Sequence, residues 1–456
     1  MKEVIKVGVS GVRGVVGASF TPQLAASFAQ AFGTFVGEGA VIVGRDTRST
    51  GPMIEHAVVA GLQSVGCKPV VVGVIPTPSL LYLVNEEGAR GGIMITASHN
   101  SVEWNALKFI ERRGLFLGSI HAEEFFDIYH QREFPLVGES AIPSAAIRQH
   151  AVEPHFDRVT SYVDASAIRD AGLRVAVDCC NGVGAVYTRA FLEERMGCTV
   201  FPLFDDPSGV FERDPEPLSE HLGALQDLVR ERDCHVGFAQ DPDGDRLAVL
   251  DETGRPIGEE ITVALAVGAV LRHHGRGPVA ANLSSGKRVE HVAHSFGVDV
   301  LWTKTGEIHV AEAMRDGGAV VGGEHTGGII IPAIHPCRDS YGGMAVILEL
   351  MALTGRTISE LCSDIPRYCL IKDKIPVGTD QAPGILRNLR RTYAEYPMNT
   401  LDGLHIDFGD RWVHIRLSNT EPVLRIIAEA PSKGDCAALV TEVRARVEEG
   451  MAGPNR

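Results

Sequence analysis

Hydrophobic and polar residues alternate along the first third of the chain in a pattern that predicts helices and strands in turn. Apolar residues from Leu24 to Phe35 recur at helical spacing, and they follow Thr21-Pro22, a capping residue and a proline at the first helical position. Short apolar runs at 41–43, 70–72 and 91–95 predict strands, with a helix over 54–65. Strands that alternate with helices indicate a doubly wound parallel α/β unit.

The same alternation occurs twice more before the pattern changes. Strands are predicted over 173–178, over 199–203 and just before Asp241, with helices around Phe191 and over 218–230, and a third set runs from 261 to 331. From 367 onward, alternating strand patterns are joined by helices near 385–393 and 437–448. We therefore predict three similar doubly wound α/β domains and a smaller C-terminal α+β domain. The predicted borders are 1–148, 149–252, 253–365 and 366–456.

Composition narrows the function classes. The 456 residues are too many for one core, and 45% hydrophobic with 22% charged residues is ordinary globular composition. A formal charge of -15 argues against a nucleic-acid or anionic-membrane surface. The nine cysteines include no C-x-x-C pair, and the first residues are too few and too charged for a signal peptide. We expect a cytoplasmic protein that binds neither nucleic acid nor membrane.

Three aspartates form the clearest candidate metal site. Asp241, Asp243 and Asp245 alternate after a predicted strand, and Gly244 lets the backbone curl so that the carboxylates can converge. Without a cation they would repel one another strongly. Mg²⁺ held by three carboxylates still lacks ligands, which a phosphate oxygen can supply, and Arg246 would suit that phosphate. The alternative is a solvated acidic turn, because Asp-Gly is also a hairpin signal.

Ser98 is the candidate phosphate carrier. It follows the predicted strand over 91–95, and ligands of open α/β sheets bind at the carboxyl ends of strands. A serine flanked by small and polar residues there can act as a nucleophile. Turn or cap formation is the alternative, since Ser, Thr and Asn are common at such junctions.

Three further loops offer groups for sugars or anions. Glu324 and Thr326, framed by glycines in 323–328, suit a sugar-hydroxyl clamp, although a tight turn explains them almost equally well. The segment 416–422 presents hydroxyls and backbone N–H groups after Arg416, as an anion nest would, with Arg425 nearby. Arg13 lies in a glycine-rich loop over 10–14.

These stretches, in this order, resemble one family, the α-D-phosphohexomutases. The family carries a T-A-S-H-N phosphoserine loop, a D-x-D-G-D-R metal loop, a G-E-x-S-G sugar loop and an R-x-S-N-T-E-P phosphate loop. This chain has T-A-S-H-N at 96–100, D-P-D-G-D-R at 241–246, G-E-H-T-G at 323–327 and R-L-S-N-T-E-P at 416–422. The resemblance spans 10–425, essentially the whole chain, and the pattern is most similar to archaeal-type phosphoglucosamine mutases.

The resemblance implies a four-domain, heart-shaped protein with a central cleft, and it implies a role for each loop. Ser98 would be the phosphoserine and, with the three aspartates, a ligand of one Mg²⁺. Lys108 and His99 would be general acid/base candidates, and Arg13 and Arg246 would approach the transferred phosphoryl group. Sugar hydroxyls and the non-reacting phosphate would contact the following residues: Glu324 and Thr326 for the sugar, and Arg416, Ser418, Asn419, Thr420 and Arg425 for the phosphate.

The implied reaction moves a phosphoryl group between the 6- and 1-positions of a hexose phosphate, with a hexose bisphosphate as activator and intermediate. Glucosamine 6-phosphate is the preferred substrate, and phosphomannomutase or phosphoglucomutase activity is the alternative. A phosphatase using an aspartate of the Asp241 loop would not need Ser98 or the phosphate loop. A non-catalytic sugar-phosphate-binding protein is the alternative outside the enzymes. We expect a monomer or a homodimer.

Departures from the family pattern concentrate in the sugar loop. Gly328 stands where several bacterial members have histidine, and His325-Thr326 replaces the more usual Gln-Ser or Met-Ser. Ser101 replaces a common proline and Ala106 a common glycine, and both are compatible with the loop. The departures bear on the choice of sugar rather than on the type of reaction.

Overall fold

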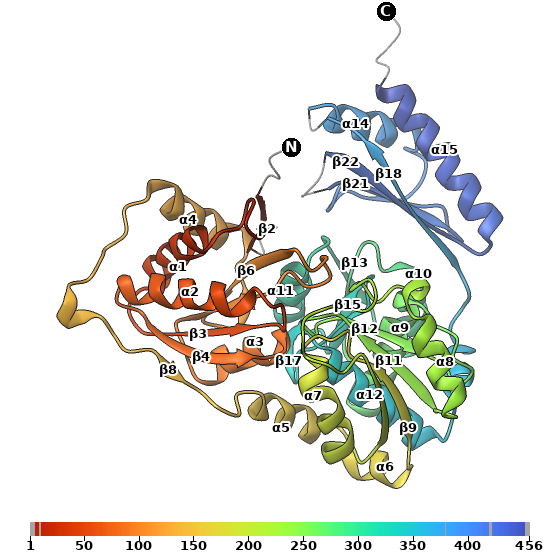
Figure 1. Ribbon diagram of the computed structural model, residues 1–456. Coiled ribbons are helices and arrows are strands. Elements are labelled where there is room, and N and C mark those ends of the chain that lie inside the picture. Colours follow the sequence, from red (N-terminus) through yellow and green to blue (C-terminus); the bar gives the residue numbers. More distant parts are fainter. Residues whose placement is uncertain (1–4, 9–10, 379, 419–421, 452–456) are drawn as a thin grey trace, which may run out of the picture.

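The computed structural model describes residues 5–8, 11–378, 380–418 and 422–451, which form four sheets with their helices in chain order (Figure 1). We call the units domains I to IV. Asn419 and Thr420 of the predicted phosphate loop lie outside the described residues.

Domain I has an eight-stranded sheet in the order β1-β2-β6-β5-β3-β4-β8, with β7 paired to β6. β3, β4, β5 and β8 are parallel, as the pattern predicts, whereas β6 runs back antiparallel to β5 and β2 to β6. The return matters for the site, because it places Lys108 on β6 directly opposite Met94 on β5. The elements are β1 (Lys6–Gly8), β2 (Gly11–Val15), α1 (Pro22–Val36), β3 (Ala40–Arg45), α2 (Gly51–Ser64), β4 (Lys68–Val74), α3 (Thr77–Glu86), β5 (Gly91–Ile95), β6 (Trp104–Glu111), β7 (Leu115–Phe116), α4 (Ser119–Gln131), the short helix η1 (Glu139–Ala141) and β8 (Ala146–Ile147).

Domain II has a four-stranded sheet in the order β10-β9-β11-β12. β11 and β12 form an antiparallel hairpin whose turn is the predicted metal loop, with Gly244 at a positive φ of 71°. The helix predicted over 218–230 is instead a 3₁₀ turn followed by α8. The elements are α5 (Glu153–Tyr162), α6 (Ala165–Asp170), β9 (Arg174–Asp178), α7 (Gly184–Ala190), the π-helix η2 (Phe191–Arg195), β10 (Thr199–Leu203), η3 (Ser219–His221), α8 (Gly223–Glu231), β11 (Val236–Gln240) and β12 (Leu247–Leu250).

Domain III has a five-stranded sheet in the order β14-β13-β15-β16-β17. β13, β14 and β15 are parallel, and β16 returns antiparallel to β15 through the predicted sugar loop. The elements are α9 (Glu259–His273), β13 (Val279–Asn282), α10 (Gly286–Ser295), β14 (Val300–Thr303), α11 (Glu307–Gly317), β15 (Val321–Glu324), β16 (Gly328–Ile331), β17 (His335–Arg338), α12 (Ser340–Thr354) and α13 (Ile358–Cys362).

Domain IV is the predicted α+β unit, an antiparallel sheet in the order β18-β22-β21-β20-β19 with two helices. It has a core of its own, built around residues such as Ile415, Ile426 and Val443. Its elements are β18 (Cys369–Pro376), α14 (Ala382–Thr392), β19 (Met398–Asn399), β20 (Leu404–Asp407), β21 (Trp412–Leu417), β22 (Val423–Ala430) and α15 (Lys433–Met451).

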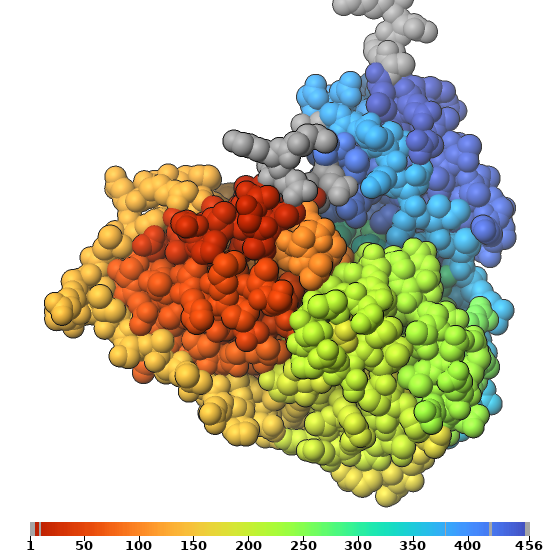
Figure 2. All heavy atoms as spheres, in the orientation of Figure 1, coloured from red at the N-terminus to blue at the C-terminus, as the bar shows by residue number. Residues whose placement is uncertain are grey.

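The hydrophobic clusters show which domains are packed together. Domains II and III share one continuous hydrophobic core, in which Phe238 of β11 and Met344 of α12 belong to the same cluster. Domain I packs against domain II (Figure 2), and domain IV is linked to domain III by the hydrogen bond of 2.7 Å from Arg288 to Glu429. Within the described part of the chain, no helix is long and apolar enough to cross a bilayer. Domain I also shares a small apolar cluster with domain III, in which Leu115 packs with Ile308 and Ala311.

Candidate active site

Ser98 of domain I and Asp241 of domain II are in direct contact. The Ser98 hydroxyl donates a hydrogen bond of 2.8 Å to Oδ2 of Asp241. Ser98 has a positive φ of 47°, an uncommon conformation for a residue with a side chain. Its backbone N–H donates to Oγ1 of Thr96 at 2.9 Å, which fixes the turn after β5. The ends of β5 and β11 thus present the serine and the first aspartate to each other.

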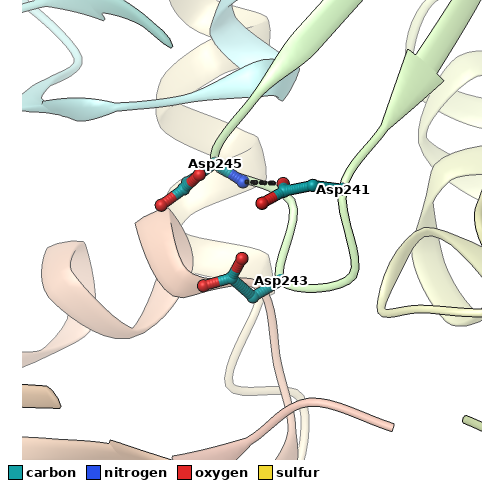
Figure 3. Close-up of side chains that lie close together, drawn as sticks. All are labelled: Asp241, Asp243 and Asp245. Atoms are coloured by element: carbon teal, nitrogen blue, oxygen red, sulfur yellow. Dashed lines mark hydrogen bonds between the residues drawn. The ribbon is translucent and has the colours of Figure 1, made fainter. Parts of the chain in front are cut away.

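The metal loop brings its three carboxylates together (Figure 3). Each offers an oxygen, and these oxygens all lie within 4.8 Å of one another. Oδ1 of Asp241 accepts from the backbone N–H groups of Asp245 and Arg246, each at 3.1 Å, so the loop curls around that carboxylate. Oδ1 of Asp243 and Oδ1 of Asp245 are buried and have no hydrogen-bond partner. Buried carboxylate oxygens without partners, in a set of three, fit a hard divalent cation.

Burial and charge act differently on two of these carboxylates. Burial, reinforced by repulsion from Asp245 and Asp243, raises the pKa of Asp241 well above its ordinary value. Burial is the largest influence on Asp243 and disfavours its ionised form, but the Lys108 charge and the hydrogen bonds with Asp241, Lys108 and Thr77 together outweigh it, and the pKa of Asp243 falls below its ordinary value. Nζ of Lys108 lies 2.7 Å from Oδ2 of Asp243. A cation among the three groups would favour ionisation of all of them.

Basic side chains surround the pair of loops. A cavity of about 170 Å³ is lined by Ser98 and His99 together with cationic residues from three domains: Arg13 and Lys108 of domain I, Arg246 of domain II and Arg338 of domain III. Arg13 donates to Oδ1 of Asn100 at 3.3 Å. Arg246 donates to Oε1 of Glu216 at 2.7 Å, and its buried Nε has no partner. Such a cavity suits a phosphoryl group, whose charge the basic side chains would balance.

His99 and Lys108 differ in protonation. Nδ1 of His99 lies 3.2 Å from the Ser98 hydroxyl, and burial followed by the charge of Arg246 lowers the pKa of His99 to about 2. The imidazole is therefore neutral at pH 7. For Lys108, burial favours the amine, but Asp243 and Asp245 outweigh it and raise the pKa above the ordinary value. Lys108 thus carries a proton and His99 does not.

The sugar loop joins this centre through Arg338. Oε1 of Glu324 accepts from the backbone N–H of Gly306 at 2.8 Å and from Nδ2 of Asn282 at 3.1 Å. Oε2 accepts from Arg338 at 3.3 Å, and the same guanidinium donates to Oδ2 of Asp245 at 2.7 Å. Arg338 therefore links the sugar loop to the metal loop. Sequence reasoning missed it, and the only signal was a basic residue at the end of a strand.

The phosphate loop lies in domain IV, apart from the cavity around Ser98. Nε of Arg416 donates to Oδ2 of Asp402 at 3.0 Å, and the same oxygen accepts from the backbone N–H of Thr305 in domain III. Arg416 pairs with Arg425 across β21 and β22, and Ser418 is buried beside them. Thr326 is half-buried in the turn between β15 and β16.

Four family descriptions match consecutive parts of the chain. They are the phosphoglucomutase/phosphomannomutase alpha/beta/alpha domains I, II and III over residues 4–135, 153–254 and 258–368, and the C-terminal domain over 370–446. The chain belongs to the phosphoglucomutase/phosphomannomutase family. It is a phosphohexomutase and hence an isomerase, as the four loops predict. The residue borders that we predict between its domains stay predictions.

Relatives and solved structures agree on the family. A probable phosphoglucosamine mutase of Methanopyrus kandleri is 37% identical over 97% of this chain and 98% of its own length. A phosphoglucomutase/phosphomannomutase of Thermococcus kodakarensis is 35% identical over 93% and 94%. The solved structure of a family protein from Burkholderia thailandensis is 25% identical over 99% and 98% of the two chains, with a TM-score of 0.85. The archaeal relatives confirm the archaeal-type pattern.

Proposed function

We propose that the protein moves a phosphoryl group between the 6- and 1-positions of a hexose phosphate through a phosphoserine at Ser98 and a bisphosphorylated sugar. The preferred substrate in this proposal is glucosamine phosphate. The observation that carries the proposal is the contact of 2.8 Å between the Ser98 hydroxyl and Asp241, inside a cavity lined by cationic side chains. Phosphoryl transfer depends chiefly on positioning and charge neutralisation, and this arrangement supplies both.

In the first half-reaction, a sugar hydroxyl attacks the phosphorus of phosphoserine 98. A bond forms between that oxygen and phosphorus, and the bond from phosphorus to the Ser98 oxygen breaks. His99, neutral at pH 7, accepts the hydroxyl proton, and Lys108 donates a proton to the Ser98 oxygen. The product is a hexose bisphosphate, and proton exchange with solvent then returns His99 to its neutral form and Lys108 to its protonated form, as their pKa values require.

In the second half-reaction, the bisphosphate has turned so that its other phosphate faces Ser98. As it attacks, the Ser98 hydroxyl gives its proton to the neutral His99, whose Nδ1 lies 3.2 Å away, and the departing sugar oxygen takes a proton from Lys108. The proton balance therefore closes over one turnover. Arg13 and Arg246 line the same cavity and would contact the transferred group in both halves.

One Mg²⁺ per chain fits the three aspartates, because two buried carboxylate oxygens there lack partners. When bound, it would neutralise charge on the phosphoryl group and on the Ser98 oxygen. A solved N-acetylphosphoglucosamine mutase of Aspergillus fumigatus, similar in fold with a TM-score of 0.57, holds GlcNAc-6P and magnesium. Hexose bisphosphate is the activator that would reload Ser98 if its phosphate were lost.

Both ends of the sugar need a holding site while the reacting end changes. Glu324 and Thr326 would hold sugar hydroxyls. The non-reacting phosphate would lie at Arg416, Ser418, Asn419, Thr420 and Arg425 in domain IV. Hydrogen bonds from arginine to phosphate are charge-assisted and strong, so one fixed phosphate site can serve either orientation of the sugar.

The names of the relatives and the charge of the sugar loop favour glucosamine. The Methanopyrus kandleri relative is named a probable phosphoglucosamine mutase, and that of Sulfurisphaera tokodaii a phosphoglucosamine/phosphogalactosamine mutase. Burial, followed by the charge of Lys372, lowers the pKa of His325 well below its ordinary value, so that ring stays neutral. The 2-ammonium group of glucosamine would then contact the Glu324 carboxylate without repulsion from His325, the next residue.

The test is an assay of the purified protein with glucosamine, glucose and mannose 6-phosphates, Mg²⁺ and a catalytic amount of hexose bisphosphate. We expect the highest kcat/KM for glucosamine 6-phosphate. Intact mass should show one labile phosphate that is absent from Ser98→Ala, and that variant should lose nearly all turnover. A fully active Ser98→Ala variant would rule out the phosphoserine route, and binding without turnover would favour the non-catalytic alternative.

A further inference from the structure

Arg48 is a buried arginine that holds the loop around Ser98 without lining the cavity. It follows β3, and its side chain is fully buried. Its NH2 group donates to the carbonyl oxygens of Ser98 at 2.7 Å and Asn100 at 2.6 Å. Its NH1 group donates to those of Ser101 at 2.7 Å and Trp104 at 3.1 Å. Four carbonyl groups of one short loop thus converge on a single guanidinium.

Asp46 completes the attachment from the other side of Ser98. Its Oδ2 accepts from Nε of Arg48 at 3.0 Å and from the Thr96 hydroxyl at 2.7 Å. The Thr96 oxygen in turn accepts from the Ser98 backbone N–H. Both the N–H and the C=O of Ser98 are therefore tied to the pair formed by Asp46 and Arg48. This support explains how Ser98 keeps a positive φ of 47°, which is unfavourable without surrounding constraint.

A segment of domain II, residues 204–216, covers Arg48; we call it the covering segment. The ring of Phe211 lies 4.9 Å from the guanidinium carbon of Arg48. At Gly209, where φ is 69°, an added Cβ would lie 2.2 Å from the carbonyl oxygen of Thr47 and 2.8 Å from Cα of Arg48. Only glycine permits so close an approach. The covering segment ends at Glu216, which holds Arg246.

Hydrogen bonds at Thr47, the residue before Arg48, also join domains I and II. The Thr47 hydroxyl donates to the carbonyl oxygen of Asn181 at 2.8 Å, and Nδ2 of Asn181 donates to the carbonyl oxygen of Val210 at 2.7 Å. The residue before Arg48 is therefore hydrogen-bonded to domain II, which also carries the metal loop.

We propose that Arg48 is a positioning residue for Ser98 and that the covering segment of domain II seats it. Domain II then fixes the phosphoserine loop of domain I relative to its own aspartates. The inference rests on the proposed role of Ser98 as phosphoryl carrier. A lysine at position 48 has one ammonium in place of the planar fork, so it cannot reach all four carbonyl groups. The loop would relax, and the Ser98 hydroxyl would move away from its position between the transferred phosphoryl group and Asp241.

The expected consequence is a loss of turnover with little change in substrate binding. A misplacement of about 1 Å costs about a hundredfold in rate, so we expect Arg48→Lys to lower kcat by that order. KM for the hexose phosphate should change little, because the proposed sugar and phosphate loops lie in domains III and IV. The single-turnover rate of Ser98 phosphorylation by hexose bisphosphate should fall by the same factor as kcat.

Gly209→Ala tests the covering segment from outside the site. It should lower kcat in the same way and leave KM little changed. The double variant with Arg48→Lys should be no slower than Arg48→Lys alone, because both changes act through the same group. Val210→Ala is the matched control, since Val210 is 60% exposed, and it should keep the activity of the unmodified protein.

Thermal unfolding of each variant shows whether it is folded. If Arg48→Lys does not fold, the proposal is tested by Gly209→Ala and Phe211→Leu, which should lower kcat and leave KM little changed. The inference fails if Arg48→Lys keeps its kcat, if KM rises while kcat does not change, or if the effects of Arg48→Lys and Gly209→Ala multiply. Ser98→Ala, assayed alongside, separates this failure from that of the proposed function. An inactive Ser98→Ala with an active Arg48→Lys overturns only the role of Arg48.

Discussion

Gly328 and Arg338 lie in such close contact that no side chain fits at position 328. A Cβ there would lie 2.2 Å from Cδ and 2.8 Å from Cγ of Arg338. The guanidinium cannot easily move aside, because it is held by Asp245 at 2.7 Å, by Glu307 at 3.1 Å and by Glu324 at 3.3 Å. The histidine that several bacterial family members have at this position would not fit beside Arg338. Arg338 in this position therefore requires glycine at position 328.

Gly328→Ala should displace Arg338 and disturb Asp245 and Glu324 together. We expect a loss of about tenfold or more in kcat/KM, since the loss of one charge-assisted hydrogen bond costs about 1.5–3 kcal/mol. In an Arg338→Ala background the same glycine substitution should cost little, because the clash is gone. Gly268→Ala is the control, since a Cβ there meets its nearest atom at an ordinary 3.5 Å. Fully additive losses would show that the two residues act independently.

Asp243→Asn should weaken binding of Mg²⁺ and lower turnover. The change removes one formal charge from the three carboxylates and replaces the oxygen that Lys108 and Thr77 contact at 2.7 Å. Calorimetric titration of the substrate-free protein with Mg²⁺ measures the binding directly, and activity at rising Mg²⁺ measures its use. Asp227→Asn on the exposed side of α8 is the control. Unchanged metal affinity in Asp243→Asn would place the cation elsewhere.

The places of the Ser98 loop and of the three aspartates were predictable from sequence, because each stretch combines a strand end with polar groups that need a partner; their roles in phosphoryl transfer and metal binding stay predictions. Thr96 to Asn100 and the three aspartates are such cases, and the alternation of elements also predicts the three α/β units and the final α+β unit. Lys108 entered only through the family resemblance, because the antiparallel return of β6 was not predicted. Arg48 and Arg338 were not found, because their partners are carbonyl or carboxylate groups from distant segments. A lone arginine after a strand shows no spacing that identifies those partners.

His335 should make the protein less stable in mild acid. It lies between domains I and III, where its Nε2 is 2.7 Å from the carbonyl oxygen of Gly114, and burial lowers its pKa from 6.5 to about 4. Below pH 6.5 the unfolded chain takes up a proton at this position that the folded protein does not. Stability is therefore lost as pH falls from 6.5 to about 4, by at most about 3 kcal/mol from this residue.

The measurement is the difference between the protein and His335→Gln in urea unfolding at several pH values. The difference in unfolding free energy should shift in favour of His335→Gln as pH falls through this window and level off below pH 4. His294→Gln, at an exposed position of α10, is the control. A difference that does not vary with pH would show that His335 acts only through packing and its hydrogen bond.

Substrate specificity should separate the sugar loop from the phosphate loop. Arg416→Ala should weaken the binding of every hexose phosphate similarly, because its loop is assigned to the phosphate that all of them share. Removing one charge-assisted hydrogen bond to phosphate should cost about ten- to a hundredfold in kcat/KM. Thr326→Ala should instead change the ranking of the sugars, since hydroxyl and ammonium positions differ among them while the phosphate does not.

The assay is kcat/KM of each variant for glucosamine, glucose and mannose 6-phosphates. Arg416 also holds Asp402, which accepts from the backbone of Thr305 in domain III, so Arg416→Ala could loosen the docking of domain IV. Asp402→Asn is the matched control, because it alters that contact between domains III and IV and leaves the Arg416 guanidinium in place. If Arg416→Ala lowers kcat/KM for all three sugar phosphates and Asp402→Asn changes these values far less, the loss is due to the phosphate contact. If Arg416→Ala changes the order of kcat/KM among the sugar phosphates while Thr326→Ala lowers all three values equally, the two loops have been assigned the wrong way round.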